Sequence, residues 1–231
     1  MQRLLLLSNS TNSGESYLGW CKQIISDFIG NTSGDIVFIP YAGVTFSYQA
    51  YTDKVNEALA EVGLRVVNID TCTDKQRAIE NATAIFVGGG NTFHLLHTMQ
   101  KLRVASSIKS AVINGTPYVG WSAGSNVACP TLCATNDMPI IQPSSFEALG
   151  LIDCQINPHY TEQIIAGHGG ESRLQRLQEY LAVNTSEQIL CVPESCYVRV
   201  EGEAMTYYGA ESGKVLSHQN ASEIFEGESI L

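Results

Sequence analysis

Residues 117–124 read PYVGWSAG, an apolar strand-like run that ends in the pattern G-x-S-x-G at residues 120–124. A short helix-like stretch, SNVAC, follows and is stopped by Pro130. This order of strand, tight turn and helix is typical of a nucleophile elbow, in which the turn pushes a serine hydroxyl out of a parallel sheet. We therefore expect Ser122 to be a nucleophile at a strand end. The alternative is a glycine-rich turn whose serine only caps a helix.

Short apolar runs alternate with amphipathic, helix-length segments on the N-terminal side of this elbow. The expected strands are residues 4–7, 36–41, 65–69, 84–87 and 117–120, and the expected helices are residues 17–29, 51–62, 92–99 and 104–113. Continuous apolar strands between amphipathic helices indicate a parallel sheet that is covered on both faces.

The C-terminal third continues with strands expected at residues 152–156, 189–192 and 197–200, and with a helix at residues 172–181. Residues 197–200 and 205–208 together predict a C-terminal β-hairpin or antiparallel edge strands. The sequence shows no linker, low-complexity tract or internal repeat. We predict a single catalytic domain over residues 1–231, of the α/β class, with a three-layer, doubly wound, mostly parallel sheet.

The composition limits the partners and the compartment. The formal net charge is −10, which opposes binding to nucleic acid and to anionic membranes, so we expect neither. The seven cysteines are odd in number and lie in apolar settings, which argues against a disulfide framework. The leucine run near the start is four residues long, too short for a signal-peptide core. We expect a cytoplasmic protein.

Three consecutive glycines, residues 88–90, lie between an expected strand and an expected helix. Their unshielded backbone amides could cradle an anion. The run is not a P-loop, because no Gly-Lys-[Ser/Thr] follows, and it is not a dinucleotide fingerprint, because Phe93 stands in place of the third glycine. The remaining specific ligand is the oxyanion of a reacting carbonyl; the alternative is a tight turn without a ligand.

A serine nucleophile needs a base, most often histidine, and a group that orients the base. His159 follows an apolar strand, which places it at the same sheet edge as Ser122. The other four histidines lie on a helix surface, in a glycine-rich loop or in the polar C-terminal tail. The strand-end position favours Glu194 as the partner of His159, whereas Asp137 would give the chain order Ser, Asp, His. The sequence leaves that choice open.

Seven segments, in order along the chain, resemble the peptidase E family of α-aspartyl dipeptidases. They are RLLLLSNST (3–11), FIPYAGVT (38–45), YTDK (51–54), VGGGNTFHLL (87–96), GWSAG (120–124) with NVACPT (126–131), TNDMPI (135–140) and INPHYT (156–161). The resemblance covers residue 3 to about residue 200. It implies a class I glutamine-amidotransferase-like fold and a serine peptidase that cleaves dipeptides with N-terminal aspartate (Asp-X), with no metal and no other cofactor.

The resemblance also implies roles for individual residues. Ser122 is the nucleophile and His159 the general base. Asp137 stands at the family's usually assigned acidic position, and Glu194 at the alternative one. Amides for the oxyanion would come from three residues: Gly89, Gly90 and Ala123.

Substrate recognition follows from the same resemblance. Residues 167–173 resemble the family segment GHKGETR, which makes Arg173 the clamp for the aspartate side chain, because its planar fork matches a carboxylate. Arg176 is the nearby alternative, and Asn91 is placed among the substrate-binding residues. Two departures, Gly169 in place of a basic residue and Ser125 in place of a small apolar one, concern affinity and substrate range rather than reaction type.

Two alternatives to Asp-X hydrolysis share the fold. One is a cyanophycinase-like hydrolase of aspartyl-arginine bonds, which has the same serine elbow. The other is a non-catalytic binding module. The expected partner is a small acidic dipeptide, and the protein is expected to be a monomer or a homodimer.

Overall fold

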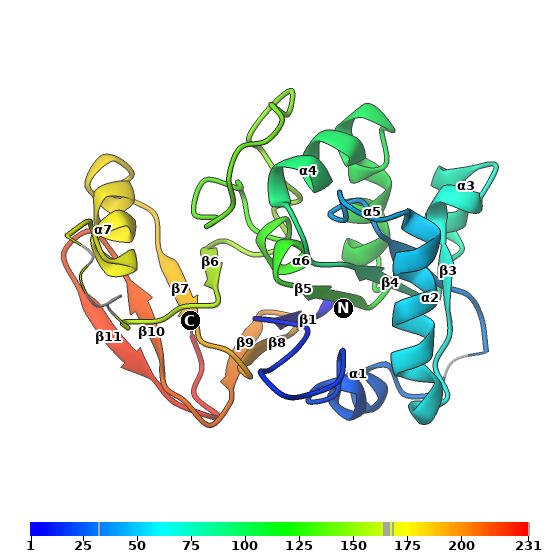
Figure 1. The fold of residues 1–231 in the computed structure, drawn as a ribbon, viewed down its shortest axis with the longest axis horizontal. Coiled ribbons are helices and arrows are strands. Elements are labelled where there is room, and N and C mark those ends of the chain that lie inside the picture. The colour runs from blue at the N-terminus through cyan, green and yellow to red at the C-terminus, as the bar shows by residue number, and fades with distance from the viewer. Residues whose placement is uncertain (32, 164–166, 168, 231) are drawn as a thin grey trace.

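In the computed structural model, which describes residues 1–31, 33–163, 167 and 169–230, the chain forms a seven-stranded sheet and a smaller four-stranded sheet (Figure 1). The N-terminal strands are β1 (Arg3–Leu7), β2 (Ile36–Ile39), β3 (Val66–Asn68), β4 (Ala84–Val87) and β5 (Tyr118–Trp121). The helices between them are α1 (Lys22–Ile29), α2 (Tyr48–Leu59), α3 (Lys75–Glu80), α4 (Thr92–Lys101) and α5 (Ala105–Ile113), with 3₁₀ turns at Ala60–Val62 and Ile69–Thr71.

The C-terminal half adds the strands of the second sheet and of one edge of the first. Its elements are α6 (Ala123–Asn126), β6 (Gln155–Pro158), α7 (Arg173–Val183), β7 (Ile189–Val192), β8 (Tyr197–Glu201), β9 (Ala204–Tyr208), β10 (Gly213–Leu216) and β11 (Ala221–Ile224).

The larger sheet has the strand order β3-β2-β4-β5-β1-β8-β9. Its first five strands are parallel to one another, whereas β8 runs antiparallel to β1 and β9 antiparallel to β8. The mostly parallel sheet and its antiparallel C-terminal hairpin are therefore confirmed. Since parallel strands end at the same edge, β4 and β5 deliver the glycine run and the serine elbow side by side.

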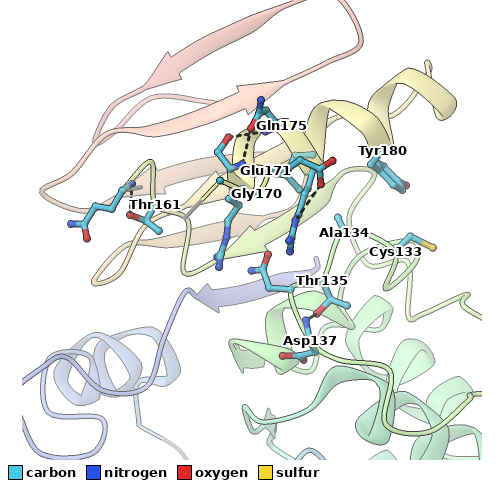
Figure 2. Close-up of a pocket in the computed structure, with 16 residues that line it drawn as sticks. Cys133, Ala134, Thr135, Asp137, Thr161, Gly170, Glu171, Gln175 and Tyr180 are labelled. Atoms are coloured by element: carbon cyan, nitrogen blue, oxygen red, sulfur yellow. Dashed lines mark hydrogen bonds and ion pairs between the residues drawn. The ribbon is translucent and has the colours of Figure 1, made fainter. Parts of the chain in front are cut away.

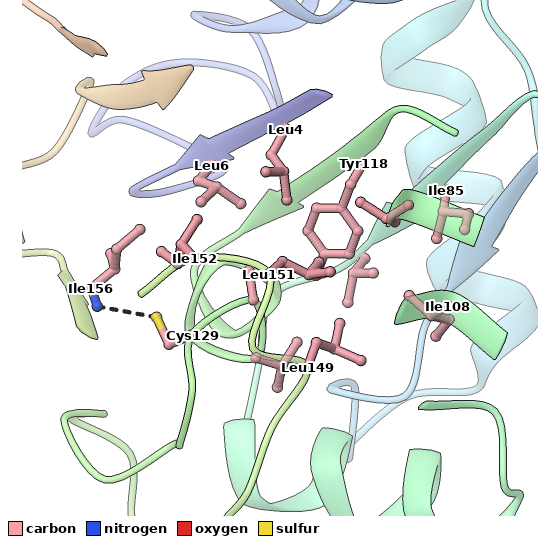
Figure 3. Packing of buried hydrophobic residues seen from close by; sticks show 14 of the residues in the cluster. Leu4, Leu6, Ile85, Ile108, Tyr118, Cys129, Leu149, Leu151, Ile152 and Ile156 are labelled. Carbon is pink, nitrogen blue, oxygen red and sulfur yellow. Dashed lines mark hydrogen bonds between the residues drawn. The ribbon is translucent and has the colours of Figure 1, made fainter. Parts of the chain in front are cut away.

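Alternate residues of each strand face opposite layers. In β1, Leu4 and Leu6 belong to one hydrophobic cluster, and Leu5 and Leu7 to the other. The first cluster is closed by α4, α5 and the segment around Leu149–Ile152, part of which Figure 3 shows. The second is closed by α1 and α2. Two covered faces give the predicted three layers.

The smaller sheet corrects one expectation. Strands β6 and β7 do not extend the main sheet; they pair in parallel in a separate sheet of order β11-β10-β7-β6. Helix α7 packs on it through Leu177 and Leu181. His159 and Glu194, which follow β6 and β7, therefore do not lie at the same sheet edge as Ser122. The apolar content of these strands indicated burial but could not indicate which sheet they join.

Local backbone chemistry shifts several expected boundaries. The first helix begins at Lys22 rather than residue 17, because Leu18 adopts a left-handed φ of 55° that a helix does not allow. Helix α7 begins one residue later than expected, because Ser172 is its N-cap in a capping box with Gln175. Within the described ranges, no helix has both the length and the apolar character that a membrane span requires.

Candidate active site

Ser122 lies on a sharp turn between β5 and α6. Its backbone has φ 53° and ψ −110°, a region that non-glycine residues rarely occupy. Its amide donates to the carbonyl of Leu7, at the end of β1 (3.1 Å). Such a conformation costs about 1–3 kcal/mol and persists only where the surroundings hold it. The strained turn predicted from G-x-S-x-G is therefore present, and it directs the hydroxyl away from the sheet.

The turn requires glycine at two positions, because backbone atoms of neighbouring segments lie where a Cβ atom would be. A Cβ on Gly120 would lie 2.5 Å from the carbonyl oxygen of Gly124. A Cβ on Gly124 would collide with the carbonyl oxygen of Val87, in β4. The elbow is thus packed directly against the strand that leads into the glycine run.

The imidazole of His159 lies between Ser122 and Glu194. Its Nε2 is 2.8 Å from Ser122 Oγ, and its Nδ1 is 2.5 Å from Glu194 Oε1. In the neutral ring, a proton on Nδ1 donated to the carboxylate leaves Nε2 free to accept the serine proton. The side chains of His159 and Glu194 are 39% and 51% exposed, so water screens their attraction more than in a buried triad.

Asp137 lies elsewhere in the site. Its Oδ2 accepts from the amide (2.6 Å) and the hydroxyl (2.5 Å) of Thr92, the first residue of α4. Among the described residues, Asp137 forms no hydrogen bond or ion pair with His159. A carboxylate at a helix N-terminus is stabilised by the free amides there. The structure thus places Glu194, and not Asp137, against the imidazole.

Asn91 caps the same helix. Its Oδ1 accepts from the amide of His94 (3.0 Å), and its Nδ2 donates to the carbonyl of Met138 (2.9 Å). Both side-chain ends are therefore used within the protein. Asn91 holds the loop that carries Asp137 against α4, a position beside the glycine run.

The three amides expected for an oxyanion are unpaired. Within the described part of the chain, the N–H groups of Gly89, Gly90 and Ala123 donate to no protein acceptor. A Cβ on Gly89 would lie 3.1 Å from Ser122 Cβ, so this backbone adjoins Ser122. Ala123 opens α6, where the helix dipole favours negative charge. Free amides converging next to a serine are what an oxyanion requires.

Arg173, the first residue of α7, reaches toward the base. Its Nη1 donates to the carbonyl of His159 (2.6 Å). Among the residues that the structure describes, it has no acidic partner, whereas Arg176 pairs with Glu171 (3.8 Å). Burial, with a smaller contribution from Arg176, lowers the pKa of Arg173, yet guanidinium remains charged at neutral pH. Arg173 therefore retains donors for a carboxylate.

A cavity of about 820 Å³ lies between the 133–137 segment and the start of α7 (Figure 2). Asp137 and Arg173 both line it, but Ser122 and His159 do not. It is connected to the reacting groups through Arg173, which contacts both the cavity and the backbone of His159. The cavity is thus a space next to Arg173 that can take part of a small polar ligand.

Two residues to which the sequence gave no role hold the base in place. Ser8 follows β1, and its Oγ accepts from the amide of His159 (2.8 Å) while donating to the carbonyl of Val192 (2.9 Å). Asn9 Oδ1 accepts from the amide of Ser195 (2.9 Å), the residue after Glu194. Ser8 and Asn9 are only 1% and 2% exposed. Two polar residues directly after a run of four leucines were the available signal.

The fold, the elbow, the base and the free amides together define a serine hydrolase of the class I glutamine-amidotransferase-like architecture. The profile of peptidase family S51 matches residues 4–208. The chain belongs to peptidase family S51.

Named relatives agree with this membership. The chain is 47% identical to a peptidase E of Nostoc sp. over 208 residues, covering 90% of this chain and 86% of the relative. It is 44% identical to a peptidase E of Salmonella typhimurium over 203 residues, covering 87% and 88%. The family resemblance seen in the sequence is confirmed.

Solved structures share the fold. A peptidase from an acI-B1 Actinobacterium superposes with a TM-score of 0.73 at 18% identity, covering 100% of this chain and 96% of that one. A candidate peptidase E from Listeria monocytogenes gives a TM-score of 0.68 at 22% identity, covering 91% and 100%.

Replacing Ser8 by alanine should weaken the site and the fold together. The substitution leaves the half-buried amide of His159 without its acceptor, which should lower the free energy of unfolding by about 1–3 kcal/mol. The imidazole then loses its fixed position, so labelling of Ser122 by a fluorophosphonate should slow about tenfold. Both are measured on purified protein, by urea unfolding and by the labelling rate.

Ser125→Ala is the matched control. Ser125 is also a buried serine, but among the residues that the structure describes its hydroxyl bonds to the carbonyls of Leu7 and Gly120 and forms no hydrogen bond with His159. Its labelling rate should stay within about twofold of the unmodified protein. Equal rates for Ser8→Ala and Ser125→Ala would show that Ser8 does not position the base.

Proposed function

We propose that this protein is a serine dipeptidase that hydrolyses dipeptides with N-terminal aspartate through an acyl-enzyme on Ser122. The observation that carries the proposal is the 2.8 Å contact between Ser122 Oγ and His159 Nε2 on a strained elbow. Membership of a peptidase family, with relatives named peptidase E, supports the reaction type. The substrate class rests on those relatives and on the charge of Arg173, which has no acidic partner among the described residues.

The first half of the reaction is acyl transfer to the serine. Ser122 Oγ attacks the scissile carbonyl carbon while His159 Nε2 accepts the hydroxyl proton. Negative charge then develops on the former carbonyl oxygen, next to the amides of Gly89, Gly90 and Ala123. His159 returns its proton to the departing amine, which frees the second residue and leaves an aspartyl ester on Ser122.

The second half repeats these roles with water. His159 accepts a proton from water as the water attacks the ester, and the same amides hold the second oxyanion. The proton then passes to Ser122 Oγ, which releases aspartate and restores the free serine. Glu194 accepts a hydrogen bond from the Nδ1–H group and stabilises the positive charge that the ring carries in both transition states.

Selectivity for aspartate requires a cation beside the acyl group, against a net protein charge of −10. Arg173 meets this need because it lines the cavity and touches the backbone of His159. A bidentate pair between guanidinium and carboxylate is the strongest form of such a contact. A small acidic dipeptide is therefore the proposed partner.

The proposed setting is the cytoplasm. All seven cysteines are free thiols, and five of them are buried. Free thiols in this number suit a reducing compartment. The proposed chemistry needs neither metal nor organic cofactor, since each of its steps uses side chains, backbone amides and water.

Replacing Ser122 by alanine should lower kcat for an Asp-Leu substrate by about 10⁴–10⁶ while the protein stays folded. The reason is loss of the attacking oxygen, with the fold unchanged because the side chain is only partly buried. The measurement is leucine release, with the unfolding midpoint as the control. Unchanged turnover would overturn the assignment of the nucleophile.

Glu194→Gln and Asp137→Asn separate the two carboxylates. Glu194→Gln should lower kcat about 10- to 100-fold, less than for a buried triad because the pair is half exposed. Asp137→Asn should change kcat less than about threefold, since its contacts are with Thr92. The reverse order of effects would assign the orienting role to Asp137. Steady-state kinetics of both variants on Asp-Leu provide the comparison.

Arg173→Ala should raise KM for Asp-Leu at least about tenfold, because a charged hydrogen bond to the substrate is lost. Inhibition by free aspartate should weaken in the same proportion. Arg176→Ala, which removes a cation already paired with Glu171, is the matched control and should leave both values near those of the unmodified protein. If Arg173→Ala lowers only kcat, its role is confined to holding His159.

A further inference from the structure

A cluster of three aromatic side chains underlies the glycine run. Tyr51, in α2, has its hydroxyl 2.9 Å from the carbonyl oxygen of Gly89, 3.2 Å from Trp121 Nε1 and 3.2 Å from the hydroxyl of Tyr17. Trp121 Nε1 also lies 3.1 Å from the Tyr17 hydroxyl. Tyr51 and Trp121 are 5% and 0% exposed, so water does not replace these bonds. The catalytic steps above use none of the three.

The direction of each hydrogen bond in this cluster is fixed. An indole N–H can only donate, and a backbone carbonyl can only accept. Trp121 Nε1 therefore donates to the tyrosine oxygens, and the single hydroxyl proton of Tyr51 goes to the carbonyl of Gly89. The Tyr17 hydroxyl then donates to Tyr51. Burial, as the largest cause, raises the pKa of Tyr51, so the hydroxyl keeps its proton at neutral pH.

The bond from Tyr51 sets the orientation of a whole peptide unit. No peptide bond among the described residues is cis, and in a trans peptide the C=O and the following N–H point in opposite directions. Because the carbonyl of Gly89 points at Tyr51, the N–H of Gly90 points away from it. The contact is close: a Cβ on Gly88 would lie 2.7 Å from the Tyr51 hydroxyl oxygen.

A peptide flanked by glycines does not hold this orientation by itself. Gly90 has φ 138°, a region that only glycine populates readily, and glycine is the residue with the most backbone freedom. Rotation of the Gly89–Gly90 peptide would exchange a donor for an acceptor beside Ser122. An acceptor there would repel the oxyanion. A fixed contact on the far side of the peptide is therefore needed.

We propose that Tyr51 is a positioning residue of the oxyanion site: its hydroxyl holds the Gly89 carbonyl so that the Gly90 N–H faces the reacting carbonyl. Trp121 links this support to the elbow, because its indole donates to Tyr51 and its backbone leads directly into Ser122. The two halves of the site, the glycine run and the nucleophile, are thereby held by one buried cluster. The inference rests on the proposed peptidase function.

The test compares Tyr51→Phe with Tyr41→Phe on Asp-Leu. Tyr51→Phe removes the hydroxyl but keeps the ring that packs edge-on against Phe38 and Phe46. We expect kcat to fall about 10- to 50-fold, less than for deletion of an oxyanion donor, with KM changed less than about threefold. Tyr41 is the matched control, because its hydroxyl is buried and has no hydrogen-bond partner in the described structure. Tyr41→Phe should leave kcat within about twofold.

A second measurement, inhibition by a transition-state analogue, tests binding of the oxyanion separately from the stability of the protein. An aspartyl peptide aldehyde forms a tetrahedral adduct with Ser122 whose oxygen lies where the oxyanion forms, whereas free aspartate does not. Tyr51→Phe should raise Ki for the aldehyde about as much as it lowers kcat, and should leave Ki for aspartate unchanged. Equal weakening of both inhibitors would mean a general structural defect and would overturn the proposal.

Tyr17→Phe provides a variant in which the loss of kcat should be intermediate. It removes a donor to Tyr51 but leaves the bond to Gly89, so its effect on kcat should be smaller than that of Tyr51→Phe. If Tyr51→Phe retains the kcat of Tyr41→Phe, the positioning role is wrong while the peptidase function stands. If the unmodified protein does not release leucine from Asp-Leu, the proposed function itself fails, and the aldehyde measurement on Ser122 then decides the positioning role alone.

Discussion

The hydroxyl of Ser8 joins the two sheets beside the contact between Ser122 and His159. Ser8 directly follows β1 in the larger sheet. Its hydroxyl bonds to backbone groups at the ends of β6 and β7 in the smaller sheet. His159 and Glu194 leave from those two strand ends, whereas Ser122 leaves from β5. The line from Ser122 through the imidazole to Glu194 therefore spans both sheets and depends on the contacts that hold them together, of which the Ser8 bonds are part.

The main sheet could be predicted because its signal is local. Apolar runs of four to six residues, most of them followed by an amphipathic helix, indicate both the strand and the layer that covers it. The smaller sheet could not be separated from it, because residues 155–158 and 189–192 are as buried as the strands of the main sheet. Which strand pairs with which depends on contacts more than thirty residues apart, such as Gln155 with Ile189, and no local pattern records them.

In the candidate site, too, features set by local sequence could be predicted and features set by distant contacts could not. Ser122 and the glycine run could be found because tight turns need particular residues at particular positions. The choice between Asp137 and Glu194 could not be made, since both are carboxylates in turns after apolar segments. The tertiary structure separates the two carboxylates. Asp137 accepts hydrogen bonds from the amide and hydroxyl of Thr92, whereas Glu194 lies against the imidazole of His159. Supporting residues such as Ser8 carry no chemical signature beyond being polar and buried.

Because Ser122 follows a strand of one sheet and His159 a strand of the other, both sheets can stay folded while the contact between these two residues is lost. A slip of about 1 Å between the sheets would leave each set of strands paired, yet it would break the contact through which the proton moves. Mild heating or dilute denaturant should then abolish the enzymatic activity while the circular dichroism spectrum of the protein still looks native. In such a molecule, the rate of turnover reports whether the interface between the two sheets is intact.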